Sequence, residues 1–160
     1  MLVYAQGVRV LGIDFGRRRI GLALSDATGL LARPWKTLAA DGSTRTVTAL
    51  AAEIAALIDE PDGLSAVALG YPRRLGGERN EQTTAVEQLA AALRGLVGVP
   101  IVLQDERLSS HEADALLARS ETDWRRRKTR LDAASAAVIL QDYLDAQPRP
   151  ASSHSQSDEL

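Results

Sequence analysis

Hydrophobic positions near the start of the chain fall into two short runs separated by a charged turn. Residues 8–13 are apolar apart from Arg9 and end on Asp14, and residues 20–24 are apolar and lead into Ser25-Asp26. The segment between them is Phe15-Gly16-Arg17-Arg18-Arg19. Short, β-branched runs bounded by glycine and charge are typical of buried strands rather than of a helix. The pattern predicts a hairpin that carries a carboxylate at the tip of its first strand.

Further apolar runs predict three more strands, at residues 30–38, 65–70 and 99–104, with Pro34 favouring a sheet edge or strand start for the first of them. Helical spacing of apolar residues predicts a helix after residues 41–43, with an inward face made by Val47, Leu50, Ala51, Ile54, Leu57 and Ile58. Further helices are expected after a cap at Asn80, from Ser109, and over about 131–144.

The order of these elements predicts the fold class. Three leading strands fit an antiparallel meander, and the later strands, which alternate with helices, need parallel crossovers. We therefore expect an α/β fold with a mixed five-stranded sheet and helices on both faces. Residues 1–145 form one domain in this interpretation, and the proline- and serine-rich segment 146–160 is expected to be a disordered tail.

Composition narrows the class of protein. The chain has 160 residues, of which 45% are hydrophobic and 25% are charged, as in ordinary globular proteins. It has no cysteine, no apolar stretch that would cross a bilayer and no secretory leader pattern, so a cytoplasmic protein is expected. The net charge is −2, so any surface that binds nucleic acid must come from local clusters of arginine.

Carboxylates occur at three separate places where such a fold would form a site. Asp14 and the Asp105-Glu106 pair each follow a predicted strand, and sites in open α/β sheets form at the carboxyl ends of strands. Asp132 is expected in the first turn of the last helix, on the stripe that faces the sheet. A buried carboxylate must pair, cap a helix or bind a cation. Together the three could bind one or two Mg²⁺ or Mn²⁺ ions and hydrolyse a phosphodiester.

Each of these acids also has an ordinary structural interpretation. Asp14 could end a strand in a turn, Asp105 and Glu106 could be surface acids paired with Arg107, and Asp132 could be a helix-start acid. Between Asp105 and Glu106 the pattern does not decide, because neighbours on a strand point to opposite faces.

Glycines and arginines surround the expected site. Gly12, Gly16 and Gly21 lack a Cβ, so a backbone or a phosphate could approach closely. The basic cluster 125–130 could be a substrate clamp, a flap or a solvated loop. The candidate nucleic-acid contacts are Arg17, Arg18, Arg73, Arg74, Arg107, Arg125, Arg126 and Arg127.

Four blocks resemble a known family in order and spacing. They are GIDFGRRRIGLALSD (12–26), ALGYPRRLGGERNEQ (68–82), QDERLSSHEA (104–113) and LDAASAAVILQDYLD (131–145). The chain is similar to the YqgF/RuvX family of Holliday-junction-resolvase-like nucleases. The resemblance implies a ribonuclease H-like fold and a role in processing the 5′ end of precursor 16S ribosomal RNA, or in resolving DNA junctions.

The resemblance also implies a set of site residues. Asp14, Glu106 (preferred over Asp105) and Asp132 would be the catalytic acids and would hold Mg²⁺ or Mn²⁺. The partner would be structured RNA or branched DNA, acted on by a monomer or a homodimer. Two other classes stay open: a non-catalytic nucleic-acid-binding module of the same fold, and a phosphotransferase of the actin and sugar-kinase type, suggested by Asp14 and Gly16 in a hairpin.

Overall fold

The protein is built on a mixed five-stranded sheet. The structure, a computed structural model, describes residues 9–42, 44–72, 80–105 and 124–148, with side chains in the last segment described from Asp132 onward. The strands are β1 (Val10–Phe15), β2 (Arg19–Ser25), β3 (Ala32–Ala39), β4 (Ala66–Tyr71) and β5 (Ile101–Asp105).

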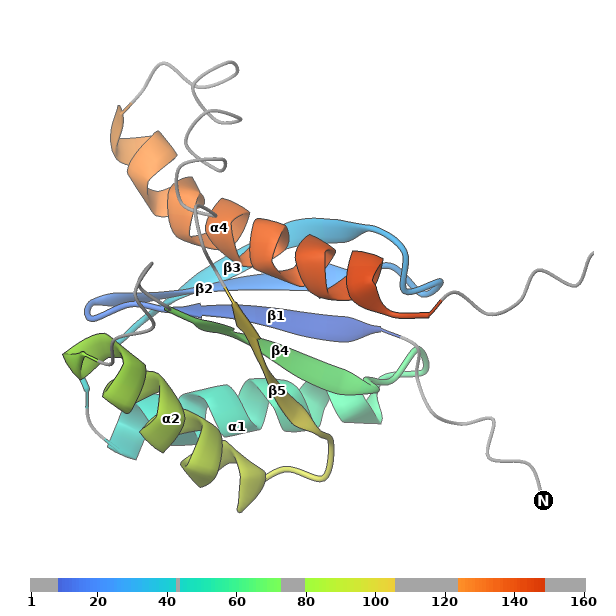
Figure 1. Cartoon of the computed structure of the whole chain (residues 1–160), viewed down its shortest axis with the longest axis horizontal. Helices are drawn as coiled ribbons and strands as arrows, with labels where there is room; N and C mark the ends of the chain where they lie inside the picture. The colour runs from blue at the N-terminus through green and yellow to red at the C-terminus, as the bar shows by residue number, and fades with distance from the viewer. Residues whose placement is uncertain (1–8, 43, 73–79, 106–123, 149–160) are drawn as a thin grey trace, which may run out of the picture.

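The strand order is β3-β2-β1-β4-β5 (Figure 1). The strands β1, β2 and β3 pair antiparallel as a meander, while β4 lies parallel to β1 and β5 lies parallel to β4. This is the mixed five-stranded sheet, with a leading antiparallel meander and later parallel strands, that the element order predicted, and Pro34 does lie on an edge strand.

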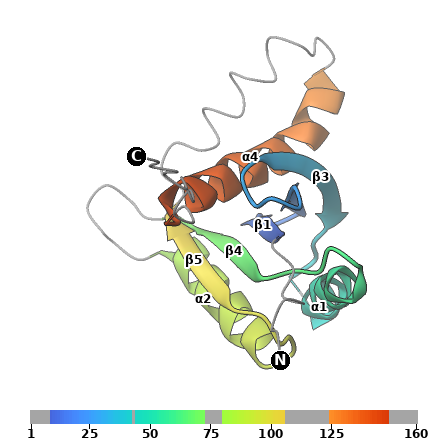
Figure 2. The same cartoon turned by 90° about the vertical axis from the view of Figure 1, so that its right-hand side faces the viewer.

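Helices cover both faces of the sheet. The helices α1 (Thr44–Asp59) and α2 (Glu81–Arg94) lie on one face, and α4 (Trp124–Ala146) lies across the other (Figures 1 and 2). In the described segments no helix is both long enough and apolar enough to span a bilayer.

Alternation along the strands divides the core into two layers. Leu11 and Ile13 of β1 are fully buried in the large cluster under α1 and α2, whereas Val10 belongs to a smaller cluster under α4. Because side chains alternate along a strand, Asp14 shares the α4 face with Val10. The α4 layer is made mostly of small residues: Ala23, Ala66, Ala68 and Ala136, with Val10 and Leu140.

Three local expectations can be compared with the structure. Asn80 does cap α2, because its side chain accepts a hydrogen bond from the Thr83 backbone N–H. The inward placement of Ile58 is wrong, since this side chain is 36% exposed near the end of α1. The last helix begins at Trp124 rather than near Leu131, so the basic cluster 125–130 is helical. The helix expected from Ser109 lies outside the described residues, as does the 149–160 part of the tail expected over 146–160, whereas Ala146 is still the last residue of α4.

A buried arginine joins the start of β1 to the end of α1, and no sequence pattern pointed to it. Arg9 is 8% exposed, and its guanidinium donates to the Gly63 carbonyl at 3.0 Å. It also forms an ion pair with Glu60 at 2.9 Å and donates to the Leu57 carbonyl at 3.4 Å. A cation near the last carbonyls of a helix is well placed to stabilise that end.

Candidate active site

The β1–β2 hairpin places Asp14 close to the tip of the central strand. Asp14 is the next-to-last residue of β1, and its partner across the pair is Gly21 of β2. The turn is closed by the Gly16 backbone N–H, which donates to the Arg19 carbonyl at 3.0 Å. The expected carboxylate at the end of the first strand is therefore present.

Two glycines of this hairpin let α4 approach the sheet. A Cβ added to Gly21 would overlap the carbonyl oxygen of Asp132, and one added to Gly12 would lie 2.7 Å from the Leu140 Cβ and 2.8 Å from the Ala136 carbonyl oxygen. The close approach predicted at these glycines is therefore made by a helix backbone. Since Gly21 is the cross-strand partner of Asp14, this contact brings Asp132 next to Asp14.

The two carboxylates interact unfavourably when both are ionised. Burial, and secondly repulsion from Asp132, raise the pKa of Asp14 from 3.8 to about 6. Desolvation and a neighbouring like charge both disfavour the ionised form of an acid. A divalent cation held by these two acids would offset both effects.

Asp132 also lies beside a cation. Its Oδ2 forms an ion pair with the Nε of Arg19 at 2.9 Å, and the two side chains are 28% and 36% exposed, respectively. Arg19 precedes Gly21 by two positions on β2, so alternation puts it on the α4 face. The expectation that Asp132 lies in the first turn of its helix is wrong, because α4 begins at Trp124, and the favourable helix N-terminus is therefore distant.

Sequence reasoning did not identify Arg19 as a partner of Asp132. The available signal was the two-residue period of β2, which places Arg19 and Gly21 on the same face as Asp14.

The acids that follow β5 are only partly described. Asp105 ends β5 in phase with Ile101 and Leu103, which pack in the core under α1 and α2, so alternation puts it on the opposite face from Asp14. In the described part of the chain no three acids, histidines or cysteines form a group that could hold a metal ion. Glu106 lies outside the described residues. The structure thus brings together two of the expected acids, Asp14 and Asp132.

The candidate nucleic-acid contacts are described unevenly. Arg17 and Arg18 lie exposed in the hairpin turn, and Arg17 pairs with Glu81 at 3.5 Å. Both members of that pair are largely exposed, so its contribution to stability is small. Arginines 125–127 lie in α4, but their side chains are outside the description, as are residues 73, 74 and 107 altogether.

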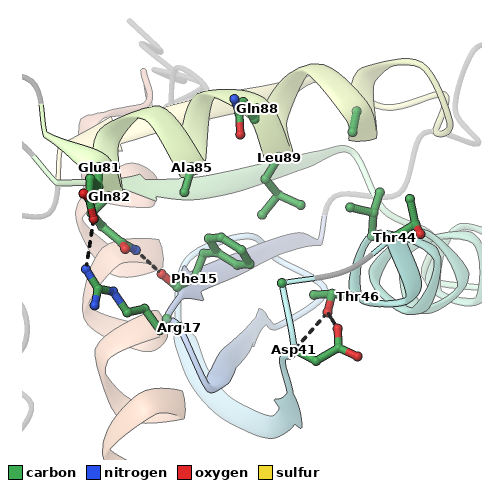
Figure 3. A pocket seen from close by; sticks show the side chains of 14 residues that line it. Phe15, Arg17, Asp41, Thr44, Thr46, Glu81, Gln82, Ala85, Gln88 and Leu89 are labelled. Atoms are coloured by element: carbon green, nitrogen blue, oxygen red, sulfur yellow. Dashed lines mark hydrogen bonds and ion pairs between the residues drawn. The ribbon is translucent and has the colours of Figure 1, made fainter.

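A pocket of about 540 Å³ lies behind the hairpin on the other face of the sheet (Figure 3). Its apolar lining includes Phe15, Val47 and Leu89, and the Gln82 side chain at its rim donates to the Phe15 carbonyl at 2.6 Å. Phe15 follows Asp14 directly and therefore faces the opposite way. The pocket is separated by the sheet from the acid pair, and no sequence pattern predicted it.

Comparison with known proteins agrees with the resemblance noted in the sequence. A protein of Chloroflexus aggregans named "Putative pre-16S rRNA nuclease" is 36% identical over 141 residues, which cover 88% of this chain and 96% of that protein. A protein of Geobacillus kaustophilus with the same name is 37% identical over 139 residues, covering 87% and 99%.

Among solved structures, the T. thermophilus RuvC in complex with a Holliday junction substrate has a TM-score of 0.46 and 21% identity, covering 82% of this chain and 90% of that one. Residues 8–146 match the RuvX family, which is described as a Holliday junction resolvase. The matched segment spans every described strand and helix, so this chain belongs to the RuvX family.

Proposed function

We propose that this protein is a metal-dependent nuclease that hydrolyses phosphodiester bonds at the 5′ end of precursor 16S rRNA in the cytoplasm. The observation that carries the proposal is the meeting of Asp14 and Asp132 at the end of the central strand, where burial and the charge of Asp132 oppose ionisation of Asp14. The names of the relatives support the RNA substrate. The description of the family supports a second candidate substrate, a DNA four-way junction.

The acid pair fits a divalent cation. Carboxylate oxygens are the ligands that Mg²⁺ and Mn²⁺ prefer, and two acids that repel each other in a partly buried site are stabilised by such an ion. We propose Glu106 as the third ligand, since it directly follows β5 and the Asp105 position is in phase with the opposite face. When bound, the metal would lower the pKa of water and stabilise the leaving oxygen.

The chain's own residues would hold and orient this centre. Asp14 is fixed by the paired strand β1, and Asp132 by the packing of α4 on Gly21, so neither acid depends on a loop for its position. Placement on strands and helices restricts a site more tightly than placement on loops. The proposed phosphate contacts are Arg17, Arg18, Arg73, Arg74, Arg107, Arg125, Arg126 and Arg127.

The test is cleavage of a precursor 16S rRNA fragment in the presence of Mg²⁺ or Mn²⁺. We expect Asp14→Asn to lower the rate by at least ~100-fold, the scale of losing a group that supports charge in the transition state. The matched control is Asp59→Asn, an exposed acid at the end of α1, which should keep the wild-type rate.

Three outcomes separate the functions. Equal cleavage by wild type and Asp14→Asn would show that the assigned acids do not perform the chemistry. Cleavage of a four-way DNA junction without cleavage of the rRNA fragment would favour the resolvase. Metal-independent binding that falls steeply with salt, with no cleavage, would identify a binding module.

A further inference from the structure

Arg19 has an unusual position for a residue next to a metal site. Its Nε lies 2.9 Å from Oδ2 of Asp132, and both side chains are about one-third exposed. Arginines that contact a phosphodiester substrate would have their guanidinium directed to the substrate. Here the Nε of the guanidinium lies within ion-pair distance of a carboxylate oxygen that the proposed function assigns to a metal ion.

The backbone around this ion pair is held firmly. Arg19 begins β2, pairs with Ala39 of β3, and accepts the hydrogen bond from Gly16 that closes the hairpin turn. Asp132 is held by the contact of its carbonyl with Gly21. Neither backbone can retreat without disturbing the sheet or α4, so a change of partner at Asp132 must come from rotation of the Arg19 side chain.

The side chain of Arg19 is able to make that rotation. The side chain as a whole is 36% exposed, and a long, flexible stem can carry the charge outward into solvent. In protein without metal, the cation at Asp132 offsets part of the negative charge that this acid shares with Asp14. A divalent ion would supply that compensation more strongly and would need the same oxygen.

We propose that Arg19 is a placeholder cation that occupies the metal-binding oxygen of Asp132 in the metal-free protein and leaves it when a divalent ion enters. The inference rests on the proposed metal-dependent function. Arg19 is a positioning residue in this scheme, because it acts through Asp132 and not on the substrate. It keeps the acid oriented when no metal ion is bound, and it weakens metal binding because the ion must displace it.

The experiment is calorimetric titration of the full chain with Mn²⁺ alone, at constant ionic strength, comparing wild type with Arg19→Gln. Removing the competing cation should lower the Kd for Mn²⁺ by about fivefold, equivalent to ~1 kcal/mol. The matched control is Arg33→Gln, which removes the same charge from an exposed position on β3 and should leave the Kd unchanged. Arg19→Lys retains a competing charge and should stay near the wild-type Kd.

The possible results separate this inference from the proposed function. Unchanged Mn²⁺ affinity in Arg19→Gln would overturn the placeholder, and weaker affinity would show instead that Arg19 only orients Asp132 for the metal. Either result leaves the nuclease proposal standing if wild type binds Mn²⁺ and Asp14→Asn does not. If neither wild type nor Arg19→Gln binds Mn²⁺, the metal site itself is refuted and the placeholder with it. If Arg19→Gln fails to fold, wild type is compared with Arg19→Lys. The lysine variant keeps the competing charge, so a Kd for Mn²⁺ at least fivefold below that of wild type would refute the competition.

Discussion

Asp14 should lower the stability of the metal-free protein at neutral pH. Its pKa is 3.8 in the absence of burial and about 6 in the fold, where burial and the charge of Asp132 disfavour ionisation. The folded state therefore binds a proton more tightly than the unfolded state does. The destabilisation is absent below pH 3.8, grows as the pH rises toward about 6, and is complete above that value. At ~1.36 kcal/mol for each pH unit between the two values, the full effect is about 3 kcal/mol.

The substitution Asp14→Asn removes this effect while keeping the size of the side chain. We expect the variant to be more stable than wild type by about 2–3 kcal/mol near pH 7.5 in the presence of EDTA. The two proteins should converge near pH 4, where Asp14 is protonated in the folded wild type. Added Mn²⁺ should raise the stability of wild type at neutral pH and leave the variant nearly unchanged, because ligand binding to the folded state stabilises it.

The measurement is the free energy of unfolding by urea at several pH values between about 4 and 7.5, with and without Mn²⁺. Asp26→Asn is a control of opposite sign, since hydrogen bonds from Thr28 and from backbone N–H groups lower the pKa of Asp26. That variant should not gain stability at neutral pH. A difference between Asp14→Asn and wild type that is zero at neutral pH, or that does not change with pH, would refute the account of Asp14 as a partly buried, repelled carboxylate.

Two further substitutions test the packing that supports the site. Gly21→Ala should lower the free energy of unfolding by about 2–3 kcal/mol and weaken Mn²⁺ binding, because the new Cβ overlaps the Asp132 carbonyl and displaces α4. The control is Gly98→Ala, whose new Cβ meets no neighbouring atom, and equal stability of the two variants would contradict the close approach of α4 to Gly21. Arg9→Met should lower the free energy of unfolding in urea by about 3 kcal/mol, because it removes the buried hydrogen bond to Gly63 and leaves that end of α1 without its cation. A loss below ~0.5 kcal/mol would show that Arg9 does not stabilise the junction of β1 and α1.

The sheet could be predicted from the sequence because its signals are local. The runs around Asp14 alternate between short apolar segments and turns, and the apolar runs of β4 and β5 are followed in the sequence by proline or by charged residues. The start of α4 could not be predicted in the same way. Residues 124–130 are polar and basic, so no apolar stripe marks them as helical, although arginine and lysine are good helix formers.

The sequence predicted which acids form the site, but not which residues surround them. Asp14 and Asp132 could be selected because they interrupt apolar patterns at a strand end and on a helix stripe. Their distance, and the pairing of Asp132 with Arg19, depend on where α4 crosses the sheet. That crossing is set by packing between segments more than a hundred residues apart, which no local period encodes.

The glycines of the β1–β2 hairpin affect both the packing of α4 and the geometry of the acid pair. A strand interior is an unfavourable place for glycine, yet Gly12 lies in the central strand β1 and Gly21 in its neighbour β2, both on the face under α4. Any side chain at Gly21 would lift the helix and separate Asp132 from Asp14, which would relieve their repulsion but would also lose the packing of α4 on the sheet. The approach of the two acids is therefore electrostatically unfavourable by itself, and a bound cation would offset that cost. The repulsion at Asp14 that this geometry causes is the physical reason to expect a metal ion, and not the Arg19 guanidinium alone, as the functional partner of the two acids.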